Sequence, residues 1–191
     1  MPVLPLARQG QSNVYYEIDN KAYVMIPFQH HMIHEGYHFY VSGFTELDTD
    51  GTLVFAATTP SGMTKEAHMR YDFDTIGAAE FEVYKNSTIT GGSSATPVNN
   101  KLSSTNTAEL VVKQDPTISV SGTLIASHKT GAVNPNPNNL VGGDVASADE
   151  LILDTNKTYI WKITSKADNN VINYTGYWYE LPSDYSTTDD E

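Results

Sequence analysis

The chain has 191 residues, of which 39% are apolar, and its 23 acidic side chains outnumber the 11 basic ones to give a formal net charge of -12. This length fits one domain with a substantial core, and the acidic balance gives no support for neutralising phosphates, so we expect neither nucleic acid nor an anionic membrane as a partner. With no cysteine, disulfides and thiolate metal sites are excluded, and no apolar run has the length of a signal peptide or a membrane span, which predicts synthesis in a cytoplasm.

Residues 1 to 36 differ in pattern from the rest of the chain. Pro2, Pro5 and Pro27 bracket two short apolar pieces, at residues 14–18 and 23–26. Proline favours extended backbone and withholds a hydrogen-bond donor. We therefore expect an extended N-terminal arm here, and not a packed subdomain.

Four of the six histidines lie within nine residues, and His30, His34 and His38 follow one another at intervals of four. On a helix this spacing would place them on one face, where neutral imidazoles can bind zinc. A helix is disfavoured because Pro27 precedes the run, Gly36 interrupts it and a strand-like sequence follows. In a strand, residues four apart are separated by roughly 13 Å, too far for three nitrogens to meet at one ion. We predict no metal site, and histidines that hydrogen-bond a turn or a subunit contact; a metal would need a helix or a further donor.

Period-two alternation, which is typical of half-buried strands, begins at Tyr37 and is clearest where Met69, Tyr71 and Phe73 alternate with polar side chains. The same pattern predicts buried positions at Phe39 and Val41, at Leu53, Phe55 and Ala57, at Phe81 and Val83, at Leu110 and Val112, and at Ile118, Val120 and Leu124. Segments 159–163 and 172–178 carry the aromatic and β-branched residues of central strands. Eight to ten strands without a βαβ rhythm predict an all-β fold, an antiparallel β-sandwich over residues 37–181, and a jelly roll is the version that accommodates its long connections.

Two long polar segments, residues 85–107 and 127–149, interrupt the predicted strands. Loops of this length inside a compact domain are usually functional or ordered by a partner, so we expect them to form contact surfaces. Capping-box spacing over residues 147–150 allows one helical turn there. Residues 182–191 form an acidic tail that we expect to be solvated and disordered.

The sequence offers no catalytic constellation. A cupin enzyme would need His-x-His followed closely by Glu, whereas residues 34–38 carry the right residue types in the wrong order. Glu80, Glu82 and Asp72 alternate with apolar residues as outward strand positions do, which argues against a glycosidase pair. Serine hydrolase and phosphate-loop signatures are absent. We therefore expect no enzyme, no catalytic residue and no cofactor, and a metal-dependent cupin-like enzyme is the most distant alternative.

Trp161 and Trp178 permit two interpretations. Aromatic faces stack on carbohydrate rings, so the two indoles could form a sugar-binding platform. Both residues nevertheless lie in phase with apolar neighbours on predicted strands, which favours a place in the core.

A series of short motifs spans about residues 30 to 180. The first half contains His30-x-x-Ile33-His34-x-Gly36-x-x-Phe39-x-x-Ser42, a strand ending in Thr58-Thr59-Pro60, and His68. The second half contains Asp115-Pro116-Thr117, Gly122-Thr123-Leu124, Gly142-Gly143, Glu150-Leu151-Ile152-Leu153, Asn156-Lys157-Thr158-Tyr159 and Trp178-Tyr179-Glu180. In order and spacing these motifs resemble a family of small structural proteins encoded in the head gene clusters of tailed bacteriophages. Basic residues that the family has near positions 99–101 and after position 143 are reduced here to Lys101.

The resemblance implies a capsid decoration or cement protein: a β-sandwich that assembles as a homotrimer on the outer surface of an icosahedral shell, without enzyme activity. Its partners would be the major capsid protein and further copies of itself, and it would be made in the host cytoplasm and end in the virion. The candidate capsid or trimer contacts are Tyr15, Tyr16, Tyr23, Phe28, His30, His31, His34 and Lys101. The alternative is a phage fibre or spike module that binds host glycans through Trp or Tyr platforms.

Overall fold

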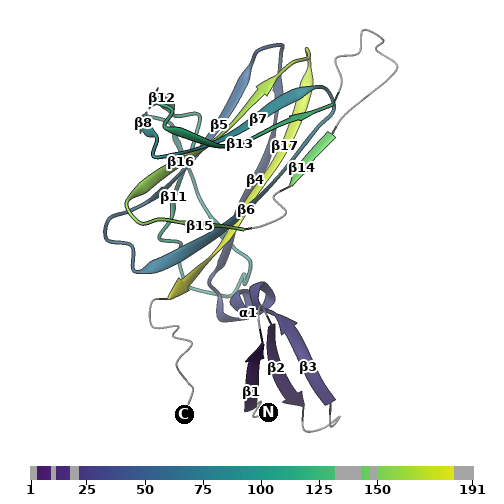
Figure 1. Ribbon diagram of the computed structural model, residues 1–191, viewed down its shortest axis with the longest axis vertical. Coiled ribbons are helices and arrows are strands. Elements are labelled where there is room, and N and C mark those ends of the chain that lie inside the picture. The colour runs from purple at the N-terminus through teal and green to yellow at the C-terminus, as the bar shows by residue number, and fades with distance from the viewer. Residues whose placement is uncertain (1–3, 10–11, 18–21, 132–142, 147–149, 183–191) are drawn as a thin grey trace.

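Two antiparallel six-stranded sheets face each other across an aromatic core and form the body of the molecule (Figure 1). The computed structural model describes the backbone of residues 4–9, 12–17, 22–131, 143–146 and 150–182, and the side chains of residues 27–131 and 150–182. The predicted all-β fold with antiparallel sheets packed as a sandwich is therefore confirmed.

The long C-terminal strand β17 lies at the centre of the first sheet and pairs with β4 on one side and β6 on the other. This sheet runs in the order β10 (Val98–Asn99), β4 (His38–Leu47), β17 (Asn170–Pro182), β6 (Lys65–Thr75) and β14 (Gly143–Ala146), and β15 (Leu151–Leu153) also pairs with β6. The second sheet runs in the order β13 (Thr123–Thr130), β7 (Ala79–Lys85), β16 (Lys157–Ser165), β5 (Thr52–Thr59), β11 (Val111–Gln114) and β9 (Ser93–Ala95).

The core between the sheets follows the predicted alternation. Met69, Tyr71 and Phe73 of β6 are buried, and the Tyr71 and Phe73 rings lie 4.9 and 4.7 Å from the ring of Phe81 in the opposite sheet. The other predicted core positions that are buried here are Phe39, Val41, Leu53, Phe55, Ala57, Val83, Leu110 and Val112. Trp161 and Trp178 are 1% and 0% exposed, so their assignment to the core is confirmed. The sandwich is thus held by inward side chains of period two.

One predicted core segment is wrong, because Val120 is 57% exposed and Leu124 is 48% exposed. Val120 ends β12 (Thr117–Val120), which pairs with β8 (Thr88–Thr90) in a separate two-stranded sheet. Ile118 of β12 packs outside the second sheet, in a small cluster with Val54, Ala56 and Ile160. Only Ile118 of this segment is partly buried, and it belongs to a two-stranded sheet of distant strands that covers the sandwich from outside, with a register shift between Ile118 and Val120.

The N-terminal residues form a small antiparallel sheet beside a helix at one end of the sandwich (Figure 1). Its strands are β1 (Leu4–Gln9), β2 (Ser12–Glu17) and β3 (Ala22–Pro27), with β2 in the middle. The described backbone does not confirm an extended arm. The helical turn expected at residues 147–150 is wrong where it would continue into residues 151–153, because these form strand β15. Residues 147–149 and the tail from residue 183 lie outside the described residues. Among the helices of the described part, none has the length and hydrophobicity to cross a membrane.

The histidine run is helical, which corrects the expectation that a helix is disfavoured there. Helix α1 spans Phe28–Glu35, follows Pro27 directly and ends at Gly36, whose φ is +77°. The Gly36 and Tyr37 N–H groups donate to the Ile33 and Met32 carbonyls, at 3.0 and 2.9 Å. Proline before a helix and left-handed glycine after it are boundary signals. Pro27 and Gly36, which the sequence pattern suggests are helix breakers, therefore mark the two ends of the helix.

Gly36→Ala is expected to lower the free energy of unfolding by about 2 kcal/mol or more. A left-handed conformation costs an L-residue roughly 1–2 kcal/mol, and an added Cβ would lie 2.5 Å from the Ser104 hydroxyl oxygen. Urea titration followed by tryptophan fluorescence measures the loss. Gly62→Ala is the matched control, since nothing lies within 4 Å of an added Cβ there. Equal stabilities for the two variants would contradict the assignment of Gly36 as the helix end.

Candidate functional site

The structure brings five of the eight predicted contact residues together around α1. Phe28, His30, His31 and His34 lie on the helix, and the Lys101 Nζ donates to the His34 carbonyl at 2.7 Å. Tyr15, Tyr16 and Tyr23 lie on β2 and β3, where Tyr16 is directly opposite Tyr23; their side chains lie outside the described ones. The helical end of the sandwich is therefore the candidate site.

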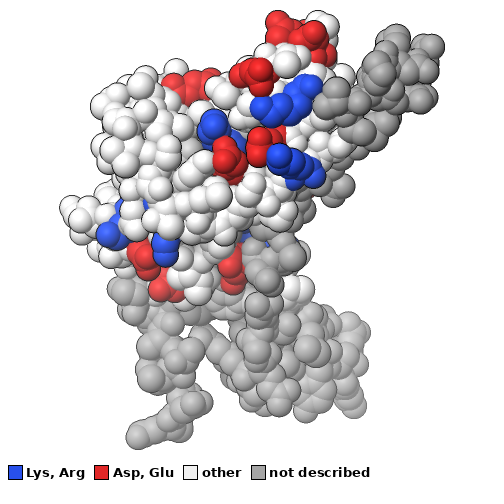
Figure 2. Space-filling model, turned by 45° about the horizontal axis from the view of Figure 1, so that its top comes forward, with Lys and Arg blue, Asp and Glu red and all other residues white. Residues whose placement is uncertain are grey.

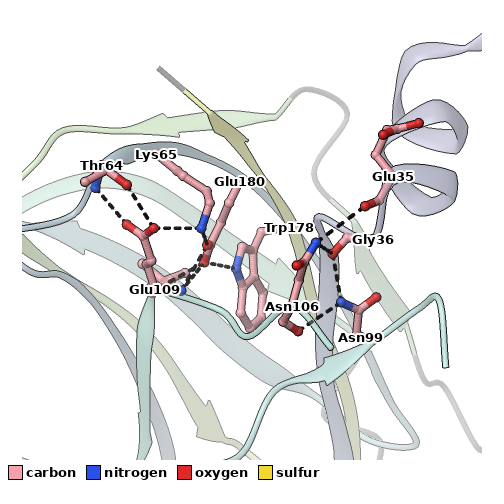
Figure 3. Close-up of polar contacts among 10 residues, drawn as sticks. Glu35, Gly36, Thr64, Lys65, Asn99, Asn106, Glu109, Trp178 and Glu180 are labelled. Carbon is pink, nitrogen blue, oxygen red and sulfur yellow. Dashed lines mark hydrogen bonds and ion pairs between the residues drawn. The ribbon is translucent and has the colours of Figure 1, made fainter. Parts of the chain in front are cut away.

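Side-chain amides from the first long polar segment hold the C-terminus of α1 (Figure 3). The Asn99 and Asn106 Nδ2 atoms donate to the Gly36 carbonyl at 2.8 and 3.2 Å, and Asn106 also lies 3.5 Å from the Glu35 carbonyl. With Lys101 they satisfy carbonyls that a helix end leaves without intrahelical partners. Sequence analysis missed both asparagines because no local pattern links residues some 70 positions apart. Lys101, proposed as an external contact, binds the helix of its own chain.

The inner side of α1 packs against the end of β17. Met32 is fully buried, and the Phe28 ring meets the Tyr179 ring edge-on with centroids 5.5 Å apart. The Tyr179 hydroxyl donates to Glu150 Oε1 at 2.9 Å and is 3.0 Å from His68 Nδ1. Burial, and then the hydrogen bond to Glu150, raise the pKa of Tyr179 well above its ordinary value. This tyrosine is therefore a hydrogen-bond donor that helps to anchor the helix, and it is not activated as a nucleophile.

His68 does not assemble a metal centre with its acidic neighbours. Its Nε2 is 2.8 Å from Glu66 Oε1, whereas its Nδ1 is 3.3 Å from Glu150 Oε1. The two carboxylates therefore lie on opposite sides of the ring and do not converge on one point. Across the described part of the chain, no group of three or more His, Asp or Glu side chains is placed to hold a metal ion.

A buried carboxylate joins the end of β17 to the segment that leads into β11 (Figure 3). Glu180 is 0% exposed, and its Oε1 accepts the Glu109 and Leu110 backbone N–H groups at 2.9 Å and the Trp178 Nε1 at 3.1 Å. Lys65 Nζ lies 3.8 Å from its other oxygen. Glu109 N also lies 2.9 Å from the second oxygen, so three N–H groups make four hydrogen bonds to the carboxylate. With the nearby ammonium they surround a charge that could not otherwise be buried.

The ammonium of Lys65 is shared with a second, more exposed carboxylate, Glu109. Lys65 Nζ is 2.6 Å from Glu109 Oε1, and the Thr64 N–H and hydroxyl donate to Glu109 at 2.7 and 3.0 Å. Partial burial would raise the pKa of Glu109, but hydrogen bonds from Lys65 and Thr64 outweigh it and lower the pKa. Lys65 and Glu109 therefore form a fixed ion pair beside the candidate site.

An open groove of about 530 Å³ lies next to the helix, on the outer face of the first sheet. It is lined by His38, Tyr40, Asn100, Leu102, Thr175 and Tyr177. Leu102 is 85% exposed, and the Arg70 guanidinium lies over the outer-face Tyr177 ring, 5.9 Å from its centroid. Tyr40 was not named from the sequence, and Tyr177 was named only as one of the C-terminal tyrosines that could join a sugar-binding platform, although both are out of phase with the buried Phe39 and Trp178. Because neighbouring residues of a strand point to opposite faces, the burial of Phe39 and Trp178 could have indicated that Tyr40 and Tyr177 face outward.

The charged side chains on the outer face of the second sheet are mixed in sign. Figure 2 shows basic and acidic groups interspersed over this part of the surface. Lys162 lies 3.2 Å from Glu82, and Lys129 lies 3.5 Å from Glu80. Glu80 and Glu82 therefore act as outward strand positions paired with lysines on neighbouring strands.

Comparison with known protein families, with curated proteins and with solved structures found no match to this chain.

Glu180→Gln is expected to lower the free energy of unfolding by about 3 kcal/mol, within the range for breaking a buried charge pair. The amide replaces an acceptor oxygen with a donor that faces N–H groups. Urea unfolding measures the change, and Glu46→Gln on the exposed side of β4 is the control. A loss below about 0.5 kcal/mol, the scale of ordinary surface substitutions, would contradict the role of Glu180.

His38 is expected to make stability fall in mild acid. Burial lowers the pKa of His38, and its hydrogen bond to Asn100 offsets this only in part. The unfolded chain therefore takes up the proton first, so this contribution is complete above about pH 6.5 and is lost as the pH falls toward the folded pKa. Unfolding free energies at about pH 7.5 and 5.5 should differ less in His38→Gln than in the parent chain, whereas His128→Gln on exposed β13 should leave the difference unchanged. An identical difference in His38→Gln would refute this assignment.

Proposed function

We propose that this protein is a virion structural protein that attaches to the outside of a phage capsid and stabilises it, as a non-enzymatic decoration or cement protein. The observation that carries the proposal is an antiparallel β-sandwich that bears a small separate sheet at one end (Figure 1). The ordered motifs from residue 30 to residue 180 support it independently of the structure.

The strand order favours a jelly roll among the possible sandwiches. Eight strands can be numbered from one to eight in chain order: β4, β5, β6, β7, β13, β14, β16 and β17. The first sheet then contains strands one, eight, three and six, in that order. The second contains five, four, seven and two. This nesting of two Greek keys is the arrangement used by viral shell domains, and also by lectins and cupins.

The N-terminal sheet adds open strand edges through which the sandwich could attach to a capsid. Within the described chain, β1 and β3 each pair only with β2, which leaves two strand edges open. Such edges add neighbouring strands through main-chain hydrogen bonds, and several weak attachments on one particle multiply in strength. We propose that these edges, with Tyr15, Tyr16 and Tyr23, contact the major capsid protein or other copies in a homotrimer.

The contact residues around α1 divide into two groups. Phe28 and Lys101 hold the helix to its own chain, through Tyr179 and the His34 carbonyl. His30 and His34 are exposed on the helix. We therefore propose the two histidines as surface groups and assign Phe28 and Lys101 to positioning the helix.

Attachment to particles tests the proposal. Untagged full-length protein should bind capsids that lack it, appear by cryo-electron microscopy at an outer symmetry position in copies that are multiples of three, and raise the temperature at which the capsids open. Tyr23→Ala should weaken binding by about tenfold or more, as expected for an interface aromatic, and Phe44→Ala, an exposed aromatic in the half of β4 away from the helix, should not. Protein found inside the shell, or at no shell position, would refute the proposal.

A glycan-binding adhesion module is the second candidate, and the groove beside α1 is the observation that favours it. Tyr40 and Tyr177 offer stacking faces, and Asn100 offers a polar side chain at the same groove. The version of this idea that uses Trp161 and Trp178 is excluded, because both are core residues. Host-glycan binding that disappears in Tyr177→Ala, with no binding to capsids, would replace the first proposal by this one.

A further inference from the structure

His30 and His34 form a pair on the exposed side of α1. Their Nε2 atoms share a hydrogen bond of 2.8 Å, and their ring centroids are 4.7 Å apart. Sequence analysis rejected a metal here because a helix was disfavoured. The helix is present, so one turn now brings together two nitrogens that a strand would separate by roughly 13 Å.

We propose that His30 and His34 chelate one divalent late-transition metal ion through their Nε2 atoms, with Cu²⁺ preferred over Ni²⁺ and Zn²⁺. Neutral imidazole is a favoured ligand of these metals, and affinity at nitrogen sites rises from Ni²⁺ to Cu²⁺ and falls at Zn²⁺. On binding, the ion replaces the hydrogen bond between the two rings: the Nε2 that carries the shared proton loses it, that ring takes its proton on Nδ1 instead, and both Nε2 lone pairs are directed at the ion. The proposal concerns this chain alone and does not rest on attachment to a capsid.

The separation of the two nitrogens fits adjacent positions in a square or octahedral metal site. At a metal–nitrogen distance of about 2.05 Å, adjacent ligands at right angles are about 2.9 Å apart, whereas tetrahedral ligands are about 3.3 Å apart. The observed 2.8 Å is close to the first value. Tetrahedral zinc would hold the two nitrogens farther apart than the metal-free pair, whereas square or octahedral copper would leave their separation nearly unchanged.

The contacts that fix α1 hold the chelate in place. An isolated helix of eight residues is unstable in water, but Asn106, Lys101 and Gly36 tie its last turn to the sandwich. The backbone of His34 is therefore fixed at its carbonyl, and less ordering entropy is lost on metal binding. Lys101 adds one positive charge nearby, while the net charge of -12 favours cations overall.

The remaining coordination positions are open, because the described side chains bring no third His, Asp or Glu to this point. We propose that water fills them, so that the stoichiometry is one ion per chain and the ion exchanges readily. This distinguishes the site from a closed structural zinc centre with four protein ligands. Its effect on the protein is to stabilise α1 at the junction between the N-terminal sheet and the sandwich.

Copper titration of the untagged full-length protein, freed of metal by chelator, tests the proposal near pH 7.5. We expect one tight site per chain by calorimetry, and an electron paramagnetic resonance spectrum with coupling to two equivalent nitrogens. His34→Ala and His30→Ala should each weaken binding by roughly tenfold or more. His128→Gln removes an exposed histidine of β13 and should change neither affinity nor spectrum.

A second readout separates loss of the ligand from loss of the fold. Copper should raise the unfolding temperature of the parent chain and of His128→Gln, as expected for a ligand that binds the folded state, but not that of His34→Ala. Circular dichroism of the metal-free variants establishes that each is folded, and His34→Gln replaces any alanine variant that is not. Single-nitrogen coupling, or undiminished affinity in a folded His34 variant, would overturn the proposal.

Discussion

Burial of the Glu180 carboxylate is the constraint on which the helical end of the molecule depends. A charge in the protein interior is tolerated only when its partners are in place, because an unpaired one costs several kcal/mol. Here the donors come from Glu109, Leu110 and Trp178, so the carboxylate joins the last strand to the segment entering β11. That segment continues from residues 99–106, which hold α1. One buried charge therefore fixes the loop, and the loop fixes the helix.

The same arrangement explains how a short helix can be rigid between two sheets. Its own eight residues supply too few hydrogen bonds to be stable alone. The two asparagine amides and Lys101 satisfy its terminal carbonyls, and Met32 and Phe28 bury its inner side against the sandwich. The N-terminal sheet, joined to the helix at Pro27, thus emerges from an ordered base. A projecting sheet can act as a contact element only if its base is ordered in this way.

Sequence patterns predicted those parts of the fold whose cause is local. Alternation placed Met69, Tyr71 and Phe73 in the core because strand geometry alone decides which way they point. It failed at Val120, since β12 pairs with the distant β8 in a two-stranded sheet outside the sandwich, and a register shift separates Val120 from Ile118. Helix α1 was disfavoured because Pro27 and Gly36 were taken as breakers, whereas the helix that they bound is held by the distant Asn99 and Asn106. The candidate site depends on the same long-range contacts, and so these two asparagines could not be named beforehand.

The motifs behind the phage resemblance can now be divided by what each residue does. Gly36 ends a helix, Asp115 and Asn156 adopt left-handed turn conformations with φ of 48° and 55°, and Glu180 anchors the end of β17. These positions are explained by folding alone. His30 and His34 are different: they are exposed, and the Lys101 hydrogen bond at His34 uses a backbone carbonyl that any residue would supply. Among the described contacts, their imidazoles hydrogen-bond to each other and not to the sandwich. The sandwich therefore does not depend on these two side chains for its folding, and a function is best sought at this pair.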